Sequence, residues 1–218
     1  MAVASLLIAT AGMAQAPVEK MLAGMAASQQ QLRQYTFRQR TETYARGELR
    51  NTRVDEVHYT DAGERVSVVV DEHAAEMQAP RRGPGHRLIE RKMLEEKEKM
   101  KEYIGRLAAL AARYHGPDPA TLQAALPAAE FITGGGSRQV RVRFRNYVKN
   151  RDSMTMTFDP DTHRPVQTDI NTFLDEDPVS IVVTFHQVHS GPSYPGRIVI
   201  NSAARQVELR LSTYDYRM

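Results

Sequence analysis

The stretch from Val140 to Phe158, VRVRFRNYVKNRDSMTMTF, decides the fold class of this 218-residue chain. Val140, Val142 and Phe144 alternate with arginines, and after a polar interruption the alternation resumes as SMTMTF, with methionine and phenylalanine on one side and threonine on the other. A period of two indicates β-strands, since successive side chains of a strand point to opposite faces of the sheet. Strict alternation further indicates an antiparallel sheet with one face in water and one face covered.

The same alternation recurs on both sides of that stretch. We expect seven further strands, at residues 35–44, 48–59, 65–71, 166–173, 179–185, 197–201 and 206–213. Ala45-Arg46-Gly47 and Thr60-Asp61-Ala62-Gly63 separate the first three, and glycine supplies the positive φ that tight turns require. These three strands therefore predict a β-meander.

Apolar residues at helical spacing predict helices before and after this meander. The first runs over 18–32, with Val18, Met21, Leu22, Met25 and Leu32 on one stripe and Pro17 in its first turn. The longest covers 88–114 and carries a charged face opposite its apolar stripe. A short helix follows, with Asp118 as the N-cap and Pro119 as the first residue. The Pro/Gly/Arg stretch 78–86 and the three glycines 134–136 read as linkers.

These elements predict an α+β fold with a curved antiparallel sheet of about nine or more strands. The helices carry the only apolar stripes that can cover the inner face of such a sheet. We therefore expect a half-barrel, incompletely closed, with helices lying across its concave side.

The N-terminal residues 1–16 have the character of a signal peptide. They are uncharged, contain an apolar run and end in Ala14-Gln15-Ala16, a small-x-small cleavage pattern. The run is too short to span a membrane as a helix, and we expect no transmembrane segment elsewhere. The prediction is an exported, periplasmic protein, with secretion as the alternative. The remainder, 17–218, is expected to be one domain with a helical insertion at about 80–130.

Composition and motifs exclude several kinds of chemistry. The chain has no cysteine, which removes disulfides, thiolate zinc sites and a cysteine nucleophile. His186 and His189 fall on opposite faces of a strand, a poor arrangement for a metal. The arginines from Arg138 to Arg151 project from the wet face without interleaved aromatic residues, so a nucleic-acid partner is not expected. No serine-hydrolase elbow or zinc-protease motif occurs. We expect no enzymatic activity, no metal and no cofactor.

Several local features form a recognisable combination. The leader ends in AQAP, and the first helix runs into Gln34-Tyr35-Thr36-Phe37. Two hairpins follow, at Gly47 and at Asp61-Ala62-Gly63, and Phe158-Asp159-Pro160 continues to Arg164-Pro165-Val166 as a strand–turn–strand unit. Together these features resemble the periplasmic lipoprotein-carrier family known as LolA, whose half-barrel also occurs in RseB-type sensor proteins.

The resemblance implies a carrier or sensor that binds lipid or lipoprotein acyl chains in a concave apolar cavity beneath a helical lid. A membrane-associated protein partner would fit such a role. The expected cavity lining consists of flexible and aromatic apolar residues, namely Met21, Met25, Tyr35, Phe37, Val68, Met93, Met100, Phe144, Met154, Met156 and Phe158. The same residues equally suit a closed core. In that case the protein would be an interaction module that docks through the long helix 88–114.

Overall fold

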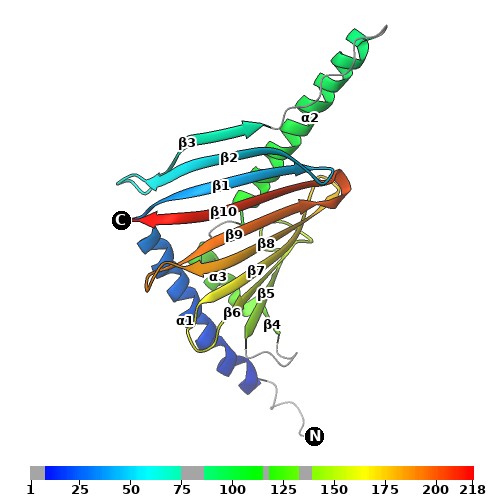
Figure 1. Cartoon of the computed structure of the whole chain (residues 1–218). Coiled ribbons are helices and arrows are strands. Elements are labelled where there is room, and N and C mark those ends of the chain that lie inside the picture. The colour runs from blue at the N-terminus through cyan, green and yellow to red at the C-terminus, as the bar shows by residue number, and fades with distance from the viewer. Residues whose placement is uncertain (1–7, 75–85, 115–117, 133–138) are drawn as a thin grey trace, which may run out of the picture.

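The computed structural model describes residues 8–74, 86–114, 118–132 and 139–218. Ten antiparallel strands form one curved, unclosed sheet in the order β3-β2-β1-β10-β9-β8-β7-β6-β5-β4 (Figure 1). The strands are β1 (Thr36–Ala45), β2 (Glu48–Tyr59), β3 (Arg65–Ala74), β4 (Glu130–Ile132), β5 (Val140–Arg145), β6 (Ser153–Phe158), β7 (Pro165–Leu174), β8 (Asp177–Gln187), β9 (Ser193–Ser202) and β10 (Val207–Arg217). The α+β half-barrel expected from the alternation is confirmed.

The described residues also form three α-helices. These are α1 (Ile8–Leu32), α2 (His86–Ala112) and α3 (Pro119–Ala125). The Asp118 carboxylate accepts hydrogen bonds from the backbone N–H and the hydroxyl of Thr121, at 2.9 and 2.7 Å, and so caps α3 as predicted. Short 3-10 turns follow α3, at Leu126–Ala128, and β9, at Ala203–Arg205.

The structure differs from the sequence prediction at several element boundaries. α1 begins at Ile8 and continues through Pro17, where a helix start was expected. β4 was missed because its three residues are too few to show a period of two. β9 begins at Ser193, four residues before the expected start of the strand 197–201. Residues 78–85 of the predicted linker 78–86 and the glycines 134–136 lie outside the described residues.

The core lies between the helices and strands β5–β10. α1 contributes Val18, Met21, Leu22 and Met25, and the C-terminal half of α2 contributes Tyr103, Leu107, Leu110 and Ala111. They meet the apolar faces of the strands, including Met154, Met156 and Phe158, each at most 1% exposed. Tyr103 is anchored to the sheet through its hydroxyl, 2.7 Å from Ser202 Oγ. We call strands β4–β10 the apolar half of the sheet.

Strands β1–β3 form a different region, which we call the polar wing. Its concave face carries Gln39, Thr41, Asn51, Arg53 and Asp55, in register across the strands. Asp55 is buried and accepts a bidentate hydrogen bond from the half-exposed Arg53, with distances of 2.8–3.1 Å. Nearly all of β3 is exposed. The concave face of the wing is therefore polar, except at one end of its strands.

The long helix α2 extends past the sheet (Figure 1). Its N-terminal half is exposed along most of its described residues, and Leu94 is 58% exposed among charged neighbours. Among the helices that the structure describes, none is both long and apolar enough to cross a bilayer.

Candidate functional site

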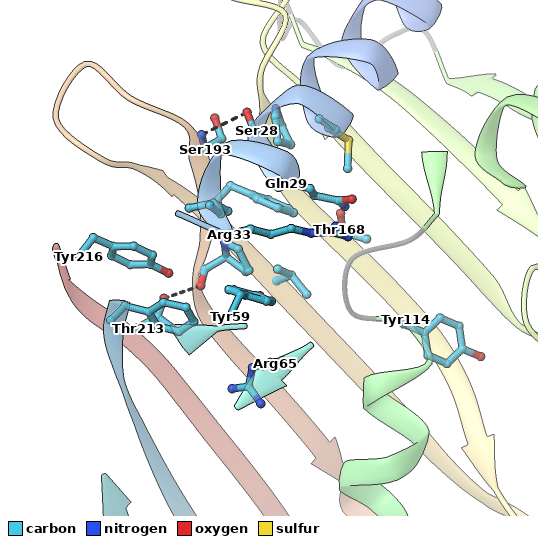
Figure 2. A pocket seen from close by; sticks show the side chains of 17 residues that line it. Ser28, Gln29, Arg33, Tyr59, Arg65, Tyr114, Thr168, Ser193, Thr213 and Tyr216 are labelled. Carbon is cyan, nitrogen blue, oxygen red and sulfur yellow. Dashed lines mark hydrogen bonds between the residues drawn. The ribbon is translucent and has the colours of Figure 1, made fainter. Parts of the chain in front are cut away.

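A cavity of about 250 Å³ remains where the end of α1 meets the sheet. It lies at the boundary between the apolar half and the polar wing, and Figure 2 shows its walls converging from both. Its lining is a mixture of apolar, aromatic and polar side chains, namely Met25, Ser28, Gln29, Leu32, Arg33, Phe37, Tyr59, Arg65, Tyr114, Pro165, Thr168, Val183, Phe185, Ser193, Pro195, Thr213 and Tyr216.

The apolar ends of the wing strands explain why the cavity forms here. Phe37 of β1 pairs with Val57 of β2, and Tyr59 follows two residues later on the same face. On the other side, the last turns of α1 supply Met25 and Leu32. The backbone N–H of Ser193 lies 3.4 Å from Ser28 Oγ, a weak hydrogen bond between α1 and the start of β9. Two apolar surfaces therefore approach each other without filling the space between them.

One wall is a group of aromatic rings. The rings of Phe37 and Tyr216 stack with centroids 4.8 Å apart, and Tyr194 contacts Tyr216 at 4.2 Å. Burial raises the pKa of the Tyr216 phenol above its usual range, so this hydroxyl stays protonated. Behind Tyr194, the His186 ring covers Gly196, where an added Cβ would lie 2.5 Å from the ring. Glycine is required at that position, because any side chain would push the ring away from the sheet.

Tyr114 closes the cavity on the side of α2 and is held by buried hydrogen bonds. Its hydroxyl lies 2.6 Å from an Asp152 carboxylate oxygen and 2.9 Å from Thr172 Oγ1. Asp152 also accepts the backbone N–H groups of the loop residues Tyr147, Val148 and Lys149. Burial is the main cause that raises the pKa of Tyr114, and the hydrogen bond to Asp152 is the second cause. The network fixes the β5–β6 loop against α2 and has a structural role.

Two guanidinium groups lie at the polar side of the cavity. Arg65 donates a 2.9 Å hydrogen bond to the amide oxygen of Gln39. Arg33 lies against the β2–β3 turn, where a Cβ at Gly63 would be 3.1 Å from its Nη1 atom. Among the residues that the structure describes, no carboxylate forms an ion pair with either arginine. Their charge therefore faces the cavity and solvent uncompensated.

The residues predicted to line a cavity are dispersed in the structure. Met25 and Phe37 line the cavity described above, and Tyr35 packs edge-on against Tyr216 beside it. Met93 and Met100 are half-buried on α2. Val68 is 53% exposed on β3, because it pairs with Glu56 and so points to the outer face of the sheet. The others belong to the packed core, namely Met21, Phe144, Met154, Met156 and Phe158.

Sequence reasoning missed the residues that form the polar side of the cavity. Arg33 follows the apolar stripe of α1, and Arg65 follows a glycine turn, so both positions resemble ordinary surface arginines. Arg65 pairs directly with Tyr59 across the β2–β3 hairpin. Knowledge of that register would have placed Arg65 on the same face as Phe37 and Val57.

Other candidate sites have structural explanations. Arg143 and Arg145 project from the outer face of β5, and both form ion pairs with Glu130 of β4, at 3.7 and 2.5 Å. Within the described part of the chain, no three histidine or carboxylate side chains group in a way that could hold a metal ion.

Comparison with known proteins gives two loose structural similarities. A LolA superfamily protein from Nitrosomonas europaea aligns over 89% of this chain and 93% of its own, with 7% identity and a TM-score of 0.36. The MucA/MucB complex of Pseudomonas aeruginosa contains a chain that aligns over 90% of this one and 93% of its own, with 10% identity and a TM-score of 0.26. Scores this low support no argument about family or function. No family model matches the sequence, and no curated protein does.

Proposed function

We propose that the protein is a non-enzymatic binding protein for an anionic amphiphile, with an exported carrier or sensor of acyl chains as its biological role. The observation that carries the proposal is the cavity of about 250 Å³, which is apolar inside and has two arginines without described carboxylate partners on its polar side. An apolar chain would enter the cavity, and its anionic head group would remain beside the arginines.

The size and lining of the cavity favour one acyl chain. Ligand pockets for drug-sized molecules usually measure about 300–1,000 Å³, so this cavity falls just below that range. Leu32, Val183 and Phe185 present apolar surface to it, and Met25 can adapt its shape to a flexible chain. Transfer of the chain from water into the cavity would stabilise the complex in proportion to the apolar area buried.

The arginines favour a carboxylate or phosphate head group. A guanidinium presents several N–H donors in a plane and forms charge-assisted, often bidentate, hydrogen bonds with both groups. Arg65 is already oriented by Gln39, and Arg33 comes from a different element, the end of α1. An anion between them would bridge the helix and the wing.

Binding of a long-chain fatty acid to the purified, delipidated protein tests the proposal, with the fatty alcohol of equal length as the ligand control. We expect saturable binding of the acid by calorimetry and a weakening of at least about tenfold for the alcohol, about 1.4 kcal/mol. Arg33→Gln should weaken acid binding and leave alcohol binding unchanged. Arg91→Gln, on the projecting half of α2, is the matched control. Absence of saturable acid binding would refute the proposal.

The apolar part of the cavity is tested separately by filling it. Val183→Phe adds a ring at a lining position that is 7% exposed, and it should reduce binding of acid and alcohol alike. Retention of circular dichroism and cooperative unfolding by Val183→Phe would show that lost binding is not lost folding.

The carrier role adds expectations about location and chemistry. Fractionation of the cells that produce the protein should place it outside the cytoplasm, shortened by the leader 1–16. A screen of ester, phosphate and peptide substrates should show no turnover. Recovery of the full-length chain from the cytoplasm would refute export without affecting the binding proposal.

A protein-interaction module is the second candidate, because most of the concave apolar face is closed by helices and α2 projects beyond the sheet. Leu94 is exposed on this projecting half. A photo-crosslinker at position 94 should then capture one defined partner in cells, whereas a crosslinker at the exposed Leu49 should not. Failure to form a specific adduct at position 94 would argue against this role.

A further inference from the structure

Strand β3 forms one edge of the sheet, and its outer edge has no partner among the described residues. It is the first strand in the sheet order and pairs only with β2. Over ten residues, the backbone groups that point away from β2 are free to pair with another strand. At the other edge, β4 has only three residues. The two edges of the sheet are therefore unequal as docking surfaces.

The exposed side chains of β3 are unusually apolar for an edge strand. Val68, Val69 and Val70 are 53%, 45% and 50% exposed, and they account for half of the six large hydrophobic residues exposed in the described chain. β-branched residues favour strand pairing, and their exposure makes burial by a partner favourable.

β3 lacks most of the features that keep natural edge strands from pairing with other strands. Natural edges are shortened or carry lysine or proline at central positions, whereas β3 reads RVSVVVDEHA, with charges only at its ends. Besides these end charges, the described strand carries a bulge at Val70, where the pairing register with β2 shifts. It leaves Arg65 to Val69 in regular pairing geometry.

We propose that β3 pairs antiparallel with β3 of a second copy of this chain, joining two sheets across a twofold axis. The charge pattern selects this occupant. β3 begins with the cation Arg65 and has the carboxylate Glu72 near its end, and both point to the concave face, since they pair with Tyr59 and Arg53 of β2. An antiparallel copy therefore places each of these charges opposite the complementary one, twice. The valines between them then meet across the axis. Such a contact is isologous and closes at two subunits.

Arg65 borders the cavity and would also face the carboxylate end of the second copy, so the two proposals share this residue. Val68 lies on the face of β3 opposite Arg65, since the two are three residues apart along regular strand. Val68→Lys therefore tests the dimer without altering the lining of the cavity, and a monomer would leave the binding proposal untouched.

Sedimentation equilibrium of the full chain, from micromolar to millimolar concentration, tests the proposal. We expect a reversible shift from the monomer mass of 24.6 kDa to twice that mass. Val68→Lys should weaken dimerisation at least tenfold, because lysine on an edge strand opposes pairing. Leu49→Lys is the matched control, since Leu49 is 41% exposed on β2, away from the edge, and it should leave the dimer unchanged.

Charge reversal tests the antiparallel arrangement specifically. Asp71→Lys with Glu72→Lys should weaken the dimer, since both ends of each strand then become basic, and adding Arg65→Glu should restore it. A monomer at all concentrations would overturn the proposal. So would a dimer that Val68→Lys leaves intact, or a triple variant that fails to recover while a folded monomer is retained. Pairing with a foreign strand would appear as a monomer here and would likewise overturn it.

Discussion

The apolar half and the polar wing are parts of one continuous sheet, yet they are stabilised in different ways. One row of the concave face follows the register across the strands as Met156, Thr168, Val183, Ile198, Leu211, Thr41 and Arg53. The row changes from mostly apolar to polar between β10 and β1. Helices bury the apolar part, and the wing relies on strand pairing and side-chain hydrogen bonds.

The difference shows that a regular β-sheet does not guarantee a uniform surface. β1 and β2 are paired along most of their length, as β6 is, but their concave positions hold mainly glutamine, threonine, asparagine, arginine and aspartate. The cavity lies at the transition, where apolar residues from both regions are present and neither region fills the space. We predict that substitutions in the two regions will differ strongly in their effect on stability.

Phe158→Ala should have the largest effect, because it empties a large, fully buried position in the apolar half. Such truncations cost about 3–5 kcal/mol in unfolding free energy. Urea unfolding of the variant and the wild type measures the difference. Thr41→Ala, on the concave face of the wing, is the comparison and should cost less than about 0.5 kcal/mol. Equal costs at both positions would mean that the wing is as tightly packed as the apolar half.

Arg53→Met should come next, since it leaves the buried Asp55 carboxylate without its bidentate partner. An unsatisfied buried acceptor costs about 1–3 kcal/mol, and the half-exposed position of Arg53 places the effect toward the lower value. The double variant Arg53→Met/Asp55→Val should recover part of the lost stability, because it also removes the unpaired Asp55 carboxylate. If the single variant were as stable as the wild type, hydrogen bonds from water would be replacing those of Arg53 at the Asp55 carboxylate.

Tyr114→Phe should cost about 0.5–1.5 kcal/mol at neutral pH, through loss of the hydroxyl contacts with Asp152 and Thr172. It also tests pH dependence. The pKa of Tyr114 is raised in the folded protein, so the unfolded chain loses this proton first, at about pH 10. Stability from the protonated phenol is therefore complete below that pH and declines above it.

The variant should show a weaker decline in unfolding free energy between about pH 9 and 11 than the wild type. Unfolding curves at several alkaline pH values would measure the slope. Identical slopes for Tyr114→Phe and the wild type would contradict the assigned role of this hydroxyl.

Glu130→Gln should have the smallest effect. It breaks ion pairs with Arg143 and Arg145 on the outer face of β5, where all three side chains are substantially exposed to water. Exposed ion pairs contribute little, since water and salt screen them. We expect no measurable change in the denaturant midpoint. A clear loss of stability would indicate that Glu130 holds the short β4 in the sheet.

The alternation of residues determined most of the secondary structure. The runs at Val140–Arg145 and Ser153–Phe158 predicted two strands within one residue of their observed ends, because their apolar faces are buried along their whole length. The stripe from Val18 to Met25 likewise predicted the buried face of α1. Such local patterns are sufficient where one face of an element is entirely apolar.

Only the tertiary structure decided which apolar residues form a core and which border a cavity. Met154 and Met25 look alike in the sequence, but Met154 is enclosed by packed side chains, and Met25 lies where α1 leaves the sheet. The cavity joins the end of α1 to strands β1, β2, β3, β7, β8, β9 and β10, and its two arginines are 32 positions apart. Local periodicity reports which way a side chain points. The volume left between two elements depends on how closely they approach, and that is set by the packing of the whole molecule.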